Sequence, residues 1–185
     1  MSAGAAVFVD RVVLVGPPGA GASTVGAALA QFLDVALADL AAVTAERLGV
    51  AEETALVAVG EERYREAERE EALEALHELL VVPGVVALGS GCLGDRDVQA
   101  SVGLVRATGA AVVALTAGTR VLATRNGLDA PRSLAFGTVR HEFGLLLADR
   151  EAACREVADA VVDTGATTPE AAAAEVLTHL SLEAG

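Results

Sequence analysis

Short β-branched apolar runs alternate along the chain with longer segments in which apolar residues recur at helical spacing. Strands buried on both faces of a parallel sheet are almost continuously apolar, whereas the helices that cover them are apolar on one side. Five runs are predicted to be strands: 12–15, 35–37, 85–88, 112–115 and 160–162. Four segments are predicted to be helices: 23–33, 61–80, 138–157 and 169–180. The alternation predicts an α/β fold with three layers, α/β/α, around a central parallel sheet of about five strands.

The boundaries of two segments carry further information. The last predicted helix has a strong start signal, because Thr168 can cap it and Pro169 occupies the first helical position. Residues 125–137 contain an Asn-Gly pair, a proline and a further glycine, so we expect a long loop or lid there.

The chain has no internal repeat and no linker of disordered composition, so residues 1–185 are expected to form a single domain.

Composition and charge narrow the class of partner. Apolar residues make up 53% of the 185 positions, and 26 acidic against 13 basic side chains give a net charge of −13. Such a charge argues against a surface that binds nucleic acid or anionic lipid. The apolar stretches fall far short of the roughly 20 residues that span a bilayer. We therefore expect a cytoplasmic protein with small-molecule or protein partners and no membrane association.

Residues 16–24, Gly-Pro-Pro-Gly-Ala-Gly-Ala-Ser-Thr, lie between the first predicted strand and the first predicted helix, where a phosphate-binding loop belongs. Against the pattern G-x-x-x-x-G-K-[ST], the segment matches at Gly16, Gly21 and Ser23. Glycines allow the loop to wrap a phosphate with its N–H groups, and the serine hydroxyl can reach Mg²⁺. The alternative is a glycine-rich turn without a ligand. The candidate nucleotide-binding residues are Gly16, Gly19, Ala20, Gly21, Ala22, Ser23 and Thr24.

The cation of the phosphate-loop pattern is missing, because Ala22 stands at the lysine position. All 13 basic residues are arginines, so no lysine from elsewhere in the fold can replace it. Losing a charge-assisted contact to the phosphates removes on the order of 1.5 to 3 kcal/mol of binding. The transition state loses more, since the lysine stabilises charge that develops during transfer.

Several further landmarks follow this loop in order along the chain. Asp39 comes shortly after the second predicted strand, and Arg65 and Glu68 stand three positions apart on the second predicted helix. The remaining landmarks are Gly89-Ser90-Gly91, Arg125, Arg132 and Arg150. Together with the loop, they resemble the shikimate kinase family, small P-loop kinases that phosphorylate the 3-hydroxyl of shikimate in aromatic amino acid biosynthesis. The resemblance spans roughly residues 12–180.

The resemblance implies a P-loop NTPase fold similar to that of nucleoside monophosphate kinases, with ATP and Mg²⁺ as cofactors. It implies that Ser23 and Asp39 hold the metal, that Asp39 and Arg132 are catalytic, and that Arg125 contacts the nucleotide. Shikimate or a similar small hydroxylated carboxylate would then bind to Arg65, Glu68, Gly89, Ser90, Gly91 and Arg150.

The Arg65–Glu68 pair has a physical rationale that does not depend on the family. Residues three apart on a helix project from one face, so the two side chains could grip an anionic, hydroxylated ring together. A guanidinium group suits a carboxylate because it can donate two parallel hydrogen bonds. On spacing alone, the alternative is a local surface ion pair.

The sequence departs from the family at positions on both sides of the reaction. Ala22 replaces the lysine that binds the nucleotide, and Ala41 replaces the second aspartate of an Asp-x-Asp pair, the candidate base for the attacking hydroxyl. Ser90 interrupts a trio of glycines. We therefore expect a degenerate member, a pseudokinase that recognises its ligand but has weak or no phosphoryl transfer. The alternatives are an active shikimate kinase in which arginines supply the missing charge, and a non-catalytic structural or regulatory partner subunit.

Overall fold

A computed structural model describes residues 9–89, 91–128 and 134–183. Its sheet has five strands: β1 (Arg11–Val15), β2 (Ala36–Asp39), β3 (Gly84–Ala87), β4 (Ala111–Thr116) and β5 (Ala160–Asp163). The strands lie in the order β2-β3-β1-β4-β5, and every neighbouring pair is parallel. The five predicted strands are confirmed, each within two residues of its predicted bounds.

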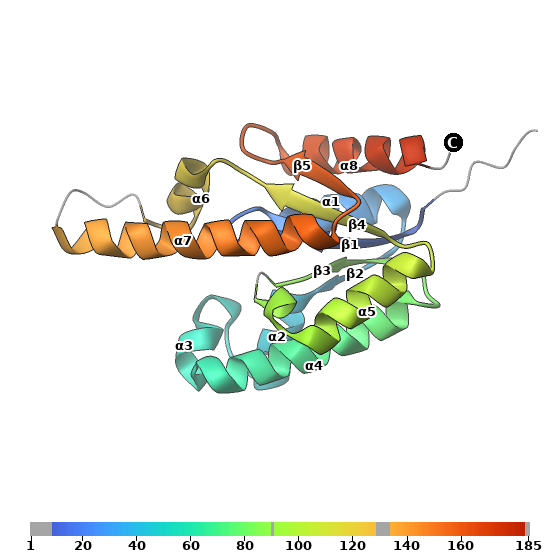
Figure 1. The fold of residues 1–185 in the computed structure, drawn as a ribbon. Coiled ribbons are helices and arrows are strands. Elements are labelled where there is room, and N and C mark those ends of the chain that lie inside the picture. Colours follow the sequence, from blue (N-terminus) through green and yellow to red (C-terminus); the bar gives the residue numbers. More distant parts are fainter. Residues whose placement is uncertain (1–8, 90, 129–133, 184–185) are drawn as a thin grey trace, which may run out of the picture.

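Helices cover both faces of this sheet, with α1 and α8 on one side and α4 and α5 on the other (Figure 1). The α-helices of the described residues are α1 (Ala22–Leu33), α2 (Leu40–Leu48), α3 (Ala55–Val59), α4 (Glu61–Leu79), α5 (Arg96–Ala107), α6 (Thr119–Arg125), α7 (Leu134–Val157) and α8 (Pro169–Glu183). The predicted three-layer α/β/α arrangement is confirmed. Within these ranges, no helix combines the length and apolar character needed to cross a membrane.

Four of these helices were not predicted: α2, α3, α5 and α6. Both α2 and α5 begin at an aspartate cap. Asp39 Oδ1 accepts a hydrogen bond from the backbone N–H of Ala41 at 3.2 Å, and Asp95 Oδ1 accepts one from Val98 at 3.1 Å. An aspartate before a helix is a sequence signal for an N-terminus. At α2 the signal was hidden because only Asp39 separates the apolar residues of β2 from those of the helix.

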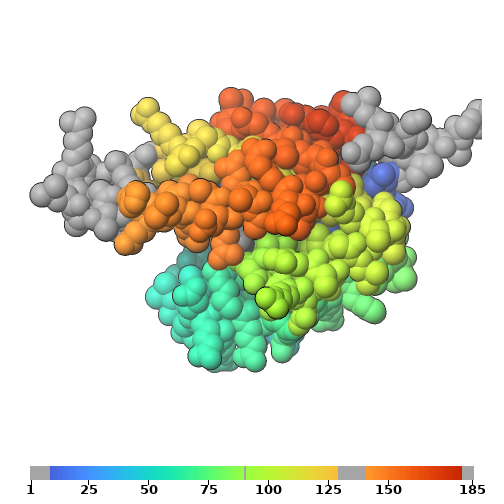
Figure 2. Space-filling model, viewed as in Figure 1, coloured from blue at the N-terminus to red at the C-terminus, as the bar shows by residue number. Residues whose placement is uncertain are grey.

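The prediction of one loop over 125–137 is wrong at both ends. Arg125 is the last residue of α6, and α7 begins at Leu134, four residues before its predicted start at 138. Arg132 lies outside the described residues. In the space-filling view, α7 extends between α8 and the helices α4 and α5 (Figure 2).

The central strand β1 is buried on both sides, as its unbroken apolar sequence indicates. Val12 and Leu14 pack into a cluster with α1 and α8, whereas Val13 and Val15 pack into one with α4 and α5. Strand β1 pairs with β3 on one side and β4 on the other. Its carboxyl end is therefore the point where the order of strands reverses, and ligands of open parallel sheets bind in that crevice.

Arg11, at the opposite end of β1, joins the ends of two helices. Its Nη1 donates a hydrogen bond to Leu80 O at 2.8 Å, and its Nη2 donates one to Thr108 O at 2.6 Å. These two residues terminate α4 and α5, where carbonyl groups lack helical partners and a cation is favoured. We expect Arg11→Met to lower the free energy of unfolding by about 1 to 2 kcal/mol in urea titrations.

Arg96→Met is the matched control for this prediction. Arg96 is exposed at the start of α5, and the described structure gives its side chain no hydrogen bond or ion pair. Its loss should change the free energy of unfolding by less than about 0.5 kcal/mol. Equal effects of the two substitutions would show that the helix-end contacts of Arg11 contribute nothing.

Candidate functional site

The glycine loop wraps the N-terminus of α1 as the sequence predicted. Gly19 and Gly21 have φ values of +81° and +94°, which glycine adopts without steric penalty. The loop lines a cavity of about 250 Å³ together with Asp39, Ala41 and Gly89. The first N–H groups of a helix lack intrahelical acceptors and carry partial positive charge, so this cavity suits an anion.

The described residues bring one charged side chain, a carboxylate, to this cavity. Among its lining residues within the described chain, Asp39 is the only charged side chain, and Ala22 contributes only a methyl group. The structure thus brings both sequence departures, Ala22 and Ala41, to the same cavity. The loop backbone offers a binding surface for phosphate, and no described residue that lines this cavity is a cation.

Ser23 and Asp39 also line this cavity, so a hydroxyl and a carboxylate oxygen are available there for a metal ion. Mg²⁺ prefers oxygen ligands of this kind and usually completes its shell with water and phosphate oxygens. Asp39 Oδ1 is used in capping α2, which leaves Oδ2 without a protein donor among the described residues. The residues present therefore fit the predicted metal, and Asp39 would then act as both helix cap and metal ligand.

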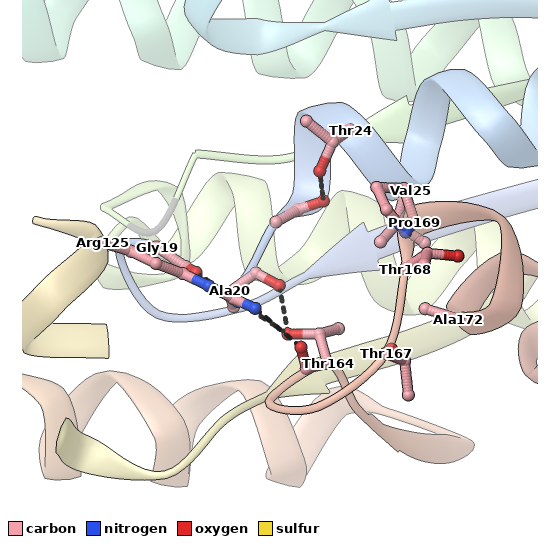
Figure 3. A pocket seen from close by; sticks show the side chains of 11 residues that line it. Gly19, Ala20, Thr24, Val25, Arg125, Thr164, Thr167, Thr168, Pro169 and Ala172 are labelled. Carbon is pink, nitrogen blue, oxygen red and sulfur yellow. Dashed lines mark hydrogen bonds between the residues drawn. The ribbon is translucent and has the colours of Figure 1, made fainter. Parts of the chain in front are cut away.

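A second cavity, of about 380 Å³, lies along the other side of the loop (Figure 3). Gly19, Gly21 and Thr24 line both cavities, so a molecule with a phosphate chain could extend from one to the other. The remaining lining residues are Ala20, Val25, Arg125, Thr164, Thr167, Thr168, Pro169 and Ala172. The turn between β5 and α8 was missed as part of the site. Its threonines carry no spacing signal, because only the fold brings them beside the loop.

Arg125 lies against the loop backbone at the end of α6. Its Nη1 donates to Gly19 O at 3.0 Å, and its Nη2 donates to Thr164 O at 2.7 Å (Figure 3). The residue is therefore beside the predicted nucleotide site, but its guanidinium is bound to backbone oxygens and does not extend from a loop.

Arg65 and Glu68 form an ion pair at the edge of the site. Arg65 Nη1 donates to Glu68 Oε2 at 2.7 Å, and Glu68 is buried, with an exposed fraction of 4%. Partial burial lowers the pKa of Arg65, but the hydrogen bond and charge of Glu68 outweigh it and hold the pKa above its ordinary value. The pair is therefore an ion pair with one buried member, Glu68, and one half-exposed member, Arg65.

Two glycines after β3 make room for this pair. A Cβ atom on Gly89 would lie 2.1 Å from Glu68 Oε1, and one on Gly91 would lie 2.3 Å from Arg65 Nη1. Arg150, on α7, donates from Nη1 to Gly91 O at 3.3 Å. The guanidinium groups of Arg65 and Arg150 therefore converge on Gly91 from two helices. Ser90 lies outside the described residues.

Cys92 lies beneath this cluster as a buried thiol. Burial, with the nearby charge of Glu68, raises the pKa of Cys92 to about 12. The thiol is therefore protonated at neutral pH and packs as a small buried apolar group.

Gly89 connects the two parts of the site. It lines the phosphate cavity, and the carboxylate of Glu68 reaches its Cα. A small anion held by Arg65 and Arg150 would consequently lie beside a phosphate held by the loop. Neighbouring sites for a phosphate and for a second anionic molecule are what a transfer between two small molecules requires.

Comparison with known proteins agrees with this arrangement. The family model described as shikimate kinase matches residues 18–181. The shikimate kinase of Thermobifida fusca is 40% identical over 161 residues, which cover 87% of this chain and 89% of that protein. The shikimate kinase of Streptomyces avermitilis is 38% identical over 177 residues, which cover 95% and 98%.

Solved structures share the fold. The shikimate kinase from Acinetobacter baumannii in complex with shikimate superposes with a TM-score of 0.73 at 22% identity, covering 93% of each chain. The shikimate kinase from Aquifex aeolicus gives a TM-score of 0.72 at 24% identity, covering 94% of this chain and 98% of that one. The fold is that of P-loop kinases, and on the family match and the two relatives the chain belongs to the shikimate kinase family.

Proposed function

We propose that this protein binds shikimate or a similar small hydroxylated carboxylate and transfers phosphate to it weakly or not at all. The observation that carries the proposal is a contrast within one site. Arg65, Glu68 and Arg150 lie together beside Gly89 and Gly91, whereas the adjoining cavity has alanines at positions 22 and 41.

Recognition is supported by the two guanidinium groups beside Gly91. Arg65 is held by the buried Glu68, so little side-chain entropy is lost when it meets a carboxylate. Arg150 approaches from another helix and has no carboxylate partner among the described residues. An anion that bridges them gains charge-assisted hydrogen bonds from two sides.

Weak transfer is supported by what the phosphate cavity lacks. Shikimate kinases use ATP and Mg²⁺, and the loop, Ser23 and Asp39 provide places for both. Without a lysine the phosphate loop holds the nucleotide only through backbone N–H groups and the metal, so nucleotide affinity is reduced. Position 41, on α2, carries an alanine. The base that would take the proton of the attacking hydroxyl is therefore missing there.

The second candidate is an active kinase, favoured by relatives at 38% and 40% identity that are named shikimate kinase. It requires an arginine to supply charge to the transferring phosphate. Arg125 is near the loop, but both of its terminal nitrogens already donate to protein oxygens. Arg132 is the other candidate. A non-catalytic partner subunit is the third possibility, and co-purification of a second chain would support it.

Calorimetric titration with shikimate and with MgATP, followed by a coupled ADP-release assay on the same sample, separates these functions. The proposal predicts shikimate binding with little or no turnover. Turnover at a rate typical of metabolic kinases, about 1 to 100 per second, would establish the active kinase. Failure to bind either ligand would leave only the partner subunit.

Arg150→Met tests the recognition half directly. We expect it to weaken shikimate binding about tenfold, because one charge-assisted hydrogen bond to the carboxylate is lost. Arg155→Met on the same helix is the control, since Arg155 pairs with Glu151 at 2.8 Å and does not contact Gly91. Calorimetry with both variants measures the difference. Equal affinities would place the carboxylate away from Arg150.

A further inference from the structure

Every backbone carbonyl of the phosphate loop from position 17 to position 21 accepts a hydrogen bond. The two outer carbonyls have partners within the local chain: Pro17 O accepts from the N–H of Ala20 at 3.0 Å, and Gly21 O accepts from that of Val25 at 2.9 Å. The three middle carbonyls accept from side chains that lie more than 100 positions away in the sequence. The fold thus brings outside donors to the centre of the loop.

Two of the outside donors stand at the end of α6. Asn126 Nδ2 donates to Pro18 O at 3.0 Å, and Arg125 Nη1 donates to Gly19 O at 3.0 Å. An independent observation indicates close packing here: a Cβ atom on Gly19 would lie only 2.6 Å from Asn126 Nδ2. The loop therefore rests directly on the end of this helix.

The third donor is Thr164, which follows β5 and is buried, with an exposed fraction of 4%. Its Oγ1 lies 2.8 Å from Ala20 O and 3.1 Å from Thr116 O, and Arg125 Nη2 donates to its carbonyl oxygen at 2.7 Å (Figure 3). Thr164 thereby joins the loop, the end of β4 and Arg125. We call Arg125, Asn126 and Thr164 the carbonyl latch.

We propose that the carbonyl latch consists of positioning residues that hold the phosphate loop in the conformation that binds an anion. A peptide carbonyl turned into the cavity would repel phosphate, whereas its N–H group attracts it. Binding the three central carbonyls on the outside keeps the N–H groups of the loop available to the cavity. The conformational entropy of the loop is then lost during folding and not when the anion binds.

Phosphate binding in this chain depends strongly on the carbonyl latch. Ala22 provides no charge, so the orientation of the backbone N–H groups decides how well phosphate is bound. Arg125 has a structural role in the carbonyl latch, because its terminal nitrogens donate hydrogen bonds to the loop and to Thr164. The inference rests on the nucleotide-binding part of the proposed function and is independent of whether phosphate is transferred.

The test compares Thr164→Val with Thr164→Ser and uses two probes, MgATP and inorganic tripolyphosphate with Mg²⁺. Valine removes the hydroxyl at similar volume, and serine keeps it. We expect Thr164→Val to weaken both probes by the same factor, about tenfold, and Thr164→Ser to restore most of the affinity. Tripolyphosphate has no base or ribose, so an equal loss locates the effect in the loop. A loss for MgATP alone would mean that Thr164 contacts the nucleoside and would overturn the inference, as would no loss for either probe.

A second measurement needs no ligand. The N–H groups of Ala20 and Val25, which bond to Pro17 O and Gly21 O, should exchange faster in Thr164→Val and in Asn126→Ala, while exchange in the sheet stays unchanged. Asn126 is exposed, so its substitution does not put folding at risk. Thr124→Val is the matched control, because the Thr124 hydroxyl bonds to Arg120 O within α6 and not to the loop. Unchanged loop exchange in both latch variants would overturn the inference.

Shikimate binding separates failure of this inference from failure of the proposed function. If the wild-type protein binds shikimate but not tripolyphosphate, the loop is no anion site and the latch has no role in binding. If it binds tripolyphosphate with the expected loss in Thr164→Val but does not bind shikimate, the latch stands and the proposed ligand is wrong.

Discussion

The Ala22→Lys, Ala41→Asp double variant is expected to raise kcat/KM for phosphoryl transfer from ATP to shikimate by about 10³-fold or more. Both positions line the phosphate cavity, so the new side chains would reach the reacting groups. A charge-assisted contact to the phosphates contributes about 10- to 100-fold. A positioned general base contributes about 10²- to 10⁴-fold. A coupled ADP-release assay measures the change.

The single variants separate the two losses. Ala22→Lys should act mainly through nucleotide affinity and transition-state charge, so it lowers the KM for ATP as well as raising kcat. Ala41→Asp should raise kcat with little effect on the KM for ATP. Groups that act as a unit are not additive, so each single variant is expected to recover less than its share of the double variant.

Controls for the double variant exist on the same two helices. Ala27→Lys places a lysine on an exposed position of α1, and Ala42→Asp places a carboxylate on an exposed position of α2. Neither residue lines the cavity, so neither substitution should change kcat/KM more than about twofold. A change of less than tenfold in the double variant would contradict the proposal and favour a wild-type enzyme that uses arginine.

Gly89→Ala is expected to weaken shikimate binding about 100-fold and to lower the free energy of unfolding by about 1 to 3 kcal/mol. The new methyl group would lie 2.1 Å from Glu68 Oε1 and 3.1 Å from Glu68 Cδ. Glu68 is buried and holds Arg65, so its carboxylate cannot move without weakening the ion pair. Disturbing a buried charge pair is costly because the freed charge is not fully solvated. Calorimetry and urea unfolding measure the two effects.

Gly103→Ala controls for the glycine-to-alanine change itself. Gly103 lies on the exposed side of α5, and a Cβ atom there would meet nothing within 4 Å. Because alanine is the better helix former, this variant should be up to about 1 kcal/mol more stable and should bind shikimate as the wild type does. Unaltered shikimate binding in Gly89→Ala would show that the ligand does not depend on the Arg65–Glu68 pair.

The phosphate loop and the sheet were predictable because their signals are local. The β1 run is apolar at consecutive positions, and a strand of that kind is buried wherever it lies. The glycines at 19 and 21 stand at positions with positive φ, a requirement of the loop itself. For α8, Thr168 Oγ1 accepts from the N–H of Ala171 at 3.2 Å, which confirms the predicted cap.

The sequence predicted that Arg65 and Glu68 lie together, but not which other residues they contact. Arg65 and Glu68 are neighbours on one helix, so their pairing follows from helical geometry. Their relation to Gly89 and Gly91 does not, because it depends on how α4 packs against the end of β3. Only the packed structure indicates that these glycines accommodate protein side chains.

By itself, the sequence determined the α/β class, the position of the phosphate loop and the two departures, Ala22 and Ala41, since each depends on residues close together in the chain. Only the tertiary structure decided which carbonyls of the loop accept hydrogen bonds and which side chains donate them. Asn126 and Thr164 lie 108 and 144 positions from their acceptors, and no local pattern marks them. Hydrogen bonds over such separations form only when β1, β4 and β5 align in the sheet, because that alignment brings the ends of the strands to one edge.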